Sequence, residues 1–290
     1  MQMKKILPWL AVALGCVCGV LRGLDLALGY DAATGLPTGA PFETVLYAAL
    51  ALSLAAVVWC SRGYARRGRK EDAFETYFTP IGDLSKTVFV LCAAVFALAG
   101  LAGLFLTVTG AGAPAQDALL VESAQSPLFD LATGIPLWAL ALLAAVTFVK
   151  LAGCCARGFI SAEQAALTLI PVFWAMFVVI RIFKDNSGTP GLGHYVFELL
   201  AAALLTLAFY YFSGFFFAQP RPMRFAAVSA AAVVLSLTSA AGVLVALLLG
   251  TACQTEGLLR QACFAAAAAW FTAQLVQMAG AEETAPGKAK

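Results

Sequence analysis

Charged residues and histidine are scarce in this chain of 290 residues, and their scarcity excludes most soluble architectures. Only 12% of the residues are charged and 62% are hydrophobic. Soluble domains are about a quarter charged and nearly half apolar. A folded aqueous interior cannot bury so much apolar surface, but lipid can accommodate it. The composition therefore predicts an integral membrane protein.

The sequence also lacks the motifs that carry catalysis, cofactors and metals. It contains no nucleophile elbow, H-E-x-x-H pair, Walker loop or Rossmann glycine pattern. His194 is the single histidine, which excludes bis-histidine haem ligation and a His-rich metal cage within one chain. The eight cysteines form no C-x-x-C pair, and we interpret them as small packing residues. We expect no enzyme activity, no catalytic residue, no cofactor and no metal site.

Long apolar runs account for most of the chain. A helix rises about 1.5 Å per residue, so about 20 apolar residues cross a hydrocarbon layer of about 30 Å. Because lipid offers no hydrogen-bond partners, such runs must form helices rather than open strands. The sequence predicts an all-α bundle within one transmembrane domain, 1–280, followed by a disordered tail, 281–290. Eight spans are expected, at about 6–28, 42–60, 87–109, 136–155, 165–183, 195–217, 225–250 and 257–279.

The distribution of lysine and arginine predicts the orientation, because basic residues in short loops stay on the cytoplasmic side. If both termini are cytoplasmic, only Arg22, Arg181, Lys184 and Arg260 lie towards the outside. The cytoplasmic segments then hold the others: Lys4, Lys5, Arg62, Arg66, Arg67, Arg69, Lys70, Lys86, Lys150, Arg157, Arg221, Arg224, Lys288 and Lys290. We therefore expect both termini inside. The net charge of +2 averages over two different faces and gives no indication of nucleic-acid binding.

Two similar segments indicate an internal repeat. Residues 30–37 have the sequence YDAATGLP, and residues 129–136 have the sequence FDLATGIP. Each segment precedes an expected inward-running helix that ends in a basic turn. We interpret 1–63 and 86–158, which hold spans 1–2 and 3–4, as a duplicated hairpin.

The repeated segment has the residues of a turn. An Asp shortly before Thr-Gly suits an Asx-type turn, and the following proline suits the start of a helix. The alternative is a pair of outer loops that bind a ligand or cation through Asp31 and Asp130.

Ionisable residues near the outer ends of the spans are the candidate functional residues, because charges within membrane spans are costly. They occur three or four positions apart, on one helix face: Arg22 with Asp25, Arg181 with Asp185, His194 with Glu198, and Glu256 with Arg260. One interpretation is a polar, ligand-binding cup formed by Arg22, Asp25, Arg181, Asp185, His194 and Glu198. The other is four independent ion pairs. The cup requires spans 1, 5 and 6 to be neighbours, with Arg22 and Arg181 pointing inwards.

The longest hydrophilic segment, 61–86, is basic up to Lys70 and then acidic and aromatic. Phe74, Tyr77 and Phe78 are three and four residues apart, which predicts a short helix whose apolar stripe lies on the membrane surface. The basic half is expected to attract anionic lipid headgroups. The alternative is a docking site for a protein partner.

Two further features concern helix packing. Pro171 falls within span 5, where a proline can kink or break a membrane helix. Small residues line span 7 and predict close contact with a neighbouring helix: Ser229, Ala232, Ser236, Ser239, Ala240 and Gly242.

Short motifs along the chain resemble those of a group of uncharacterised bacterial multi-span membrane proteins. They are Ile170-Pro171-Val172-Phe173-Trp174, Phe209-Tyr210-Tyr211, Gly214-Phe215 and Pro220-Arg221-Pro222, together with the region of Arg22 and Thr34-Gly35. The resemblance implies a location in the bacterial cytoplasmic (inner) membrane and no particular activity.

The leading hypothesis is therefore a non-catalytic membrane protein that acts as a small-solute permease or a sensor, with a polar site at the outer leaflet. The alternative is a membrane scaffold or assembly subunit that binds a partner through 61–86. A cavity leading in from the outer face would support transport. A solid bundle with an exposed docking loop would support scaffolding.

Overall fold

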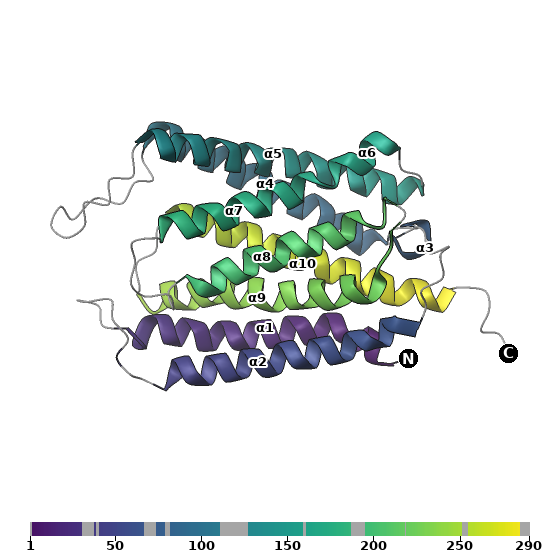
Figure 1. The fold of residues 1–290 in the computed structure, drawn as a ribbon, viewed down its shortest axis with the longest axis horizontal. Helices are drawn as coiled ribbons and strands as arrows, with labels where there is room; N and C mark the ends of the chain where they lie inside the picture. Colours follow the sequence, from purple (N-terminus) through teal and green to yellow (C-terminus); the bar gives the residue numbers. More distant parts are fainter. Residues whose placement is uncertain are drawn as a thin grey trace.

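The computed structural model is an all-α protein whose long helices run side by side (Figure 1). It describes residues 2–30, 38, 41–66, 74–78, 82–110, 127–158, 161–186, 195–217, 219–250 and 255–284. Within these residues, eight helical segments are long and apolar enough to cross a membrane. The predicted fold class is confirmed, and the protein is a multi-pass membrane protein.

The helices are α1 (Gln2–Leu28), α2 (Phe42–Ser61), α3 (Phe74–Phe78), α4 (Asp83–Thr109), α5 (Pro127–Arg157), α6 (Ala162–Leu167), α7 (Ile170–Asp185), α8 (Val196–Ser213), α9 (Pro222–Leu248) and α10 (Thr255–Thr284), with a 3-10 turn, η1 (Arg62–Arg66). The consecutive helices α6 and α7 together make the fifth span. Helix α10 continues into the predicted tail, whose residues 285–290 lie outside the described part of the chain.

Two hairpins flank a central group of helices. The α1–α2 pair lies on one side and the α4–α5 pair on the other, with α7, α8, α9 and α10 between them (Figure 1). Helix α1 packs most closely on α9, and α4 packs on α5 and α10. The start of α1 and the end of α10 lie at the same end of the bundle (Figure 1). Following the predicted orientation, we call this the inner end and the opposite end the outer end.

The second copy of the repeated segment is helical, so its interpretation as a turn is wrong. Residues 129–136 lie inside α5, which contains Pro136. At Gly134 a Cβ atom would lie 2.7 Å from the Thr107 side chain of α4, so the segment packs tightly against its hairpin partner. A backbone at membrane depth keeps its helical hydrogen bonds because lipid supplies none. Residues 31–37 lie outside the described residues, and the duplication itself stays a prediction.

Glycines bring α1 and α9 into close contact. Gly15, Gly19 and Gly23 recur at every fourth position along one face of α1. A Cβ atom at Gly19 would lie 2.6 Å from the Cβ of Ala241 on α9, closer than real Cβ atoms approach. Small residues four apart allow membrane helices to pack backbone against backbone. Span 7 is therefore closely packed, but α1 meets mainly Leu237, Ala241 and Val245, and of the small residues predicted to make the contact only Gly242 faces it.

The fifth span is broken between α6 and α7, at the site predicted from Pro171. Proline has no backbone N–H, so the carbonyl of Leu167 loses its helical partner. The hydroxyl of Thr147 on α5 lies 3.4 Å from that carbonyl and shares its hydrogen with the Leu143 carbonyl of its own helix, at 3.0 Å. The hydroxyl of Ser213 on α8 donates to the carbonyl of Thr168 at 3.0 Å. Neighbouring helices thus satisfy the backbone where water is absent.

Helix α3 lies within the bundle, so its predicted position on the membrane surface is wrong. Phe74, Tyr77 and Phe78 are at most 4% exposed. The Phe78 ring packs edge-on against Phe212 of α8, with centroids 5.4 Å apart. The Gln277 amide of α10 donates to the Phe78 carbonyl at 2.7 Å. The spacing of the aromatic residues correctly predicts the helix. Its position differs because aromatic side chains of the protein's inner end bury these residues more fully than a lipid interface would.

We expect Gln277→Leu to loosen α3 without unfolding the bundle. One hydrogen bond contributes about 1 kcal/mol, so backbone exchange in residues 74–78 should become about fivefold faster. Hydrogen exchange with mass spectrometry measures this directly. Thr272→Val is the matched control, because the Thr272 hydroxyl bonds within its own helix, α10, to the Ala268 carbonyl at 2.8 Å. Equal exchange rates in both variants would show that Gln277 does not hold α3.

Candidate functional site

Four charged residues from three helices meet at the outer end and form what we call the outer ionic cluster. Arg260 of α10 pairs with Glu198 of α8, Nε to Oε1, at 2.8 Å. It also pairs with Asp185 of α7, Nη1 to Oδ2, at 3.3 Å. Asp185 also forms an ion pair with Arg181, whose Nε lies 3.0 Å from Oδ1. The signs alternate along the chain of contacts, and the formal charge of the four side chains sums to zero.

A fourth helix joins the outer ionic cluster through a hydroxyl. The Arg181 guanidinium donates to Oγ1 of Thr133 on α5 at 2.8 Å. Thr133 belongs to the second copy of the repeated segment, so its role here is to hold an arginine rather than to form a turn. The outer ionic cluster thus connects α5, α7, α8 and α10.

Burial makes charge balance necessary in the outer ionic cluster. The exposed fractions of the side chains are 10% for Arg181, 25% for Asp185, 15% for Glu198 and 8% for Arg260. Removing one partner of a buried pair leaves an uncompensated charge, which is strongly destabilising. The dipole of α8 also stabilises the outer ionic cluster, because Glu198 lies in the first turn of this helix, where the dipole favours negative charge.

Arg22 and Asp25 form a separate buried ion pair on α1, with Nη1 and Oδ2 2.6 Å apart. Gly242 of α9 leaves room for the arginine, since a Cβ atom there would lie 2.6 Å from Cγ of Arg22. The Arg22 guanidinium lies 4.6 Å from the centroid of the Phe197 ring, a cation–π contact. Phe197 immediately precedes Glu198 in the first turn of α8. This turn therefore contacts both the Arg22–Asp25 pair, through Phe197, and Arg260 of the outer ionic cluster, through Glu198.

Tyr30 follows α1 and adjoins the Arg22–Asp25 pair. Burial raises the pKa of its phenol, and the nearby positive charge of Arg22 opposes that rise. The backbone next to it is fixed, because the N–H of Thr38 donates to the carbonyl of Gly29 at 2.9 Å. Tyr30 is thus a neutral group beside the buried pair at neutral pH.

The structure brings together part of the predicted cup. Arg22 and Arg181 are both buried, as the cup required. The cup also required spans 1, 5 and 6 to be neighbours; α7 packs on α8, but α1 packs on α2, α9 and α10 and not closely on α7 or α8, so this condition is met only in part. Arg181, Asp185 and Glu198 share one cluster and are not independent pairs, whereas Arg22 and Asp25 remain a pair of their own. His194 lies outside the described residues. Ligand binding by these residues stays a prediction.

Sequence reasoning missed Arg260 as a member of the site. It paired Arg260 with Glu256 one turn away, and that pairing stays a prediction; the guanidinium also reaches Asp185 and Glu198 on neighbouring helices. The side chain of Glu256 lies outside the described residues. Charge balance was the available signal, because two acids and one arginine at the outer end require a further cation.

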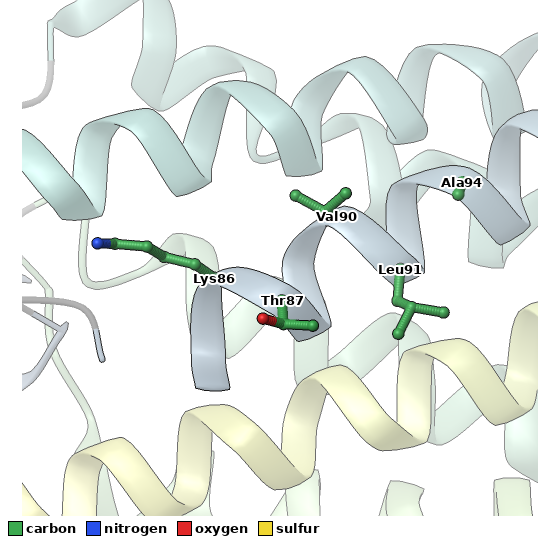
Figure 2. A pocket seen from close by; sticks show the side chains of 5 residues that line it. All are labelled: Lys86, Thr87, Val90, Leu91 and Ala94. Atoms are coloured by element: carbon green, nitrogen blue, oxygen red, sulfur yellow. The ribbon is translucent and has the colours of Figure 1, made fainter. Parts of the chain in front are cut away.

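A groove of about 380 Å³ lies on one helix, lined by Lys86, Thr87, Val90, Leu91 and Ala94 of α4 (Figure 2). Val90 and Leu91 are each 60% exposed, so the groove faces lipid. Its only charged residue, Lys86, pairs with Asp83 at 3.3 Å. This groove has the properties of a lipid contact and lacks the converging polar groups of a solute site.

In the part of the chain that the structure describes, no group of three or more His, Cys, Asp or Glu side chains could hold a metal ion. The cysteines described there are free thiols. No protein-family model, curated protein or solved structure matches the chain.

Proposed function

We propose that this protein is a small-solute permease, closed at both ends in this conformation, with the outer ionic cluster as its outer gate. The observation that supports this most directly is Arg260, which holds α7 and α8 together through ion pairs. A solute that brings its own charges can replace such pairs, and their separation would free three helix ends. Packing between apolar side chains offers no comparable means of opening.

The charges of the outer ionic cluster favour a dipolar solute. A carboxylate can take the place of Asp185 or Glu198 at an arginine, and an ammonium can take the place of an arginine at the acids. A solute with a single charge would leave one buried charge without a partner. The substrate class that we propose is a small zwitterion of the amino-acid type.

Polar groups below the outer end support a route through the bundle. Gln261, one residue after Arg260, and Gln274 further along α10 are buried, as are Ser229 and Ser236 of α9. Each has a side-chain polar atom without a hydrogen-bond partner among the described residues. An unsatisfied buried polar atom costs about 1–3 kcal/mol, and a passing solute or water would satisfy it.

The inner half of the bundle has features that transporters use. Helix α3 covers the inner end with aromatic side chains, and the fifth span is discontinuous between α6 and α7. Discontinuous spans often form transport sites and allow one half of a carrier to move relative to the other. We propose that α3 is the inner closure and that the protein has no catalytic activity. From the resemblance and the charge asymmetry, we further propose that it resides in the cytoplasmic membrane of a bacterium.

Uptake into proteoliposomes tests this function. The full-length protein is reconstituted, and accumulation of a mixture of ¹⁴C-labelled amino acids is compared with that of ¹⁴C-glycerol and ¹⁴C-glucose. We expect faster amino-acid entry than into protein-free liposomes, loss of the difference in Glu198→Gln, and no effect on the uncharged solutes. A monodisperse, reconstituted protein that moves none of the amino acids would contradict the permease proposal.

The same experiment separates the other candidate functions. A sensor would bind an amino acid, seen as a higher melting temperature, without uptake. A scaffold would do neither. The scaffold has less support because α3, the aromatic part of the 61–86 segment, packs inside the protein and is not exposed for docking.

A further inference from the structure

A second cavity lies at the inner end of α8, far from the outer ionic cluster. It measures about 230 Å³, and its lining includes Tyr210 and Tyr211 near the end of α8, Phe217 and Gln219 in the following turn, and Arg221 just before α9. The rings of Tyr210 and Tyr211 meet edge-on, with centroids 5.7 Å apart. Aromatic walls and a guanidinium group therefore share one hollow.

The fold holds this cavity in shape from two sides. Helix α8 ends at Ser213, whose hydroxyl is bonded to the Thr168 carbonyl at the break in the fifth span. The turn that follows is closed by a backbone bond of 2.9 Å from the N–H of Gln219 to the carbonyl of Gly214. The cavity is thus built on fixed backbone and does not depend on surface rotamers alone.

Positive charge borders the cavity on one side. Arg221 and Arg224 are both exposed, one turn apart around the start of α9. The N-terminus of this 27-residue helix adds a partial positive charge and backbone N–H donors. Arg221, at the N-cap position, provides no side-chain acceptor for those donors. This side of the cavity suits a phosphate group.

A stripe of apolar side chains runs from the cavity along the lipid-facing side of α8. Leu200, Leu207, Tyr210 and Phe217 are all exposed large apolar residues, and Tyr210 is 58% exposed. From Leu200 to Tyr210 the helix rises about 15 Å, which is half of a hydrocarbon layer of about 30 Å. Exposed tyrosines at such a boundary are typical of the interface between membrane and water. An acyl chain can lie along this stripe while its headgroup occupies the cavity.

We propose that the cavity beside Arg221 binds the phosphate headgroup of an anionic phospholipid from the inner leaflet. Arg221 contacts the phosphate, the two tyrosines surround the glycerol region, and an acyl chain follows the exposed stripe of α8. This lipid site is independent of the proposed transport function.

Lipid binding to the delipidated, full-length protein in detergent tests the site. Phosphatidylglycerol, phosphatidylcholine and inorganic phosphate are titrated separately, and retained lipid is counted by native mass spectrometry together with the melting temperature. We expect phosphatidylglycerol to bind more tightly than phosphatidylcholine. Arg221→Gln should lower its apparent affinity about fivefold, the contribution of one basic residue near an anionic headgroup, and Arg221→Lys should restore most of it.

Lys150→Gln is the matched control, because Lys150 is an exposed lysine of α5 that lines neither this cavity nor the groove on α4. It should leave phosphatidylglycerol binding unchanged. Equal losses in both variants would overturn the assignment, since the effect would then be one of general surface charge. An equal shift with inorganic phosphate would also overturn it, because the ligand would then be a soluble anion. Arg221 is exposed, and an unchanged melting temperature without lipid will confirm that the variant is folded.

Discussion

Replacement of Arg260 by methionine is expected to lower the free energy of unfolding by about 3–5 kcal/mol, the usual result of removing one partner from a buried ion pair. Methionine keeps most of the side-chain volume, so the loss arises from charge and not from a cavity. Asp185 and Glu198 would then both lose the ion pairs that Arg260 makes with them, while Asp185 keeps its pair with Arg181. Unfolding in SDS, followed by circular dichroism, measures the change.

A second substitution distinguishes charge imbalance from the loss of contacts. Glu198→Gln in the Arg260→Met background restores neutrality, because Asp185 keeps its pair with Arg181. The double variant should therefore be more stable than Arg260→Met alone, with a coupling free energy of about 1–3 kcal/mol. Additive effects of the two substitutions would mean that the two side chains do not interact, and the outer ionic cluster would not exist in the membrane.

The second large effect is expected at the glycine face of α1. Gly19→Leu places a branched side chain where even a Cβ atom would lie 2.6 Å from Ala241. Helices α1 and α9 must separate, and overpacking of this kind costs about 3 kcal/mol. Arg22 is one turn further on and rests over Gly242, so its contact with Phe197 should be lost as well. SDS unfolding measures the stability, and crosslinking of paired cysteines reports the distance between the helices.

Gly280→Ala is the control for this prediction. Gly280 lies on α10, and a Cβ atom there would meet nothing within 4 Å. Alanine is the better helix former, so stability should stay the same or rise by less than about 1 kcal/mol. If Gly19→Leu were as well tolerated as Gly280→Ala, α1 and α9 would not be in backbone contact.

The sequence predicts the spans well because a membrane span depends on the local run of apolar residues. Contacts between helices depend on partners far away in the chain, and here the sequence predicts less. The sequence shows that Arg260 is charged. Its partners on α7 and α8, however, depend on the relative orientation of three helices, which the sequence does not show. The burial of Phe78 likewise depends on aromatic residues more than a hundred positions later.

Local signals can also suggest a conformation that tertiary packing overrides. The Thr-Gly-x-Pro order in residues 133–136 has the composition of a turn, yet the segment is helical because it packs against α4. The glycine repeat of α1 is legible in the sequence as Gly15, Gly19 and Gly23, four apart. Its significance depends on the face of α9 with Leu237, Ala241 and Val245, which lies more than two hundred positions later in the sequence.

The bond between Gln277 and Phe78 joins residues 199 positions apart, which has a consequence for biogenesis. At about 5–20 residues per second, a ribosome needs about 10–40 s to make the intervening chain. During that interval the Phe78 carbonyl lacks this donor, the aromatic face of α3 first waits for Phe212 of α8, and α1 waits for α9 to be synthesised. The first spans must therefore persist in the bilayer as loosely held intermediates, within reach of insertion chaperones and quality-control proteases, until translation ends.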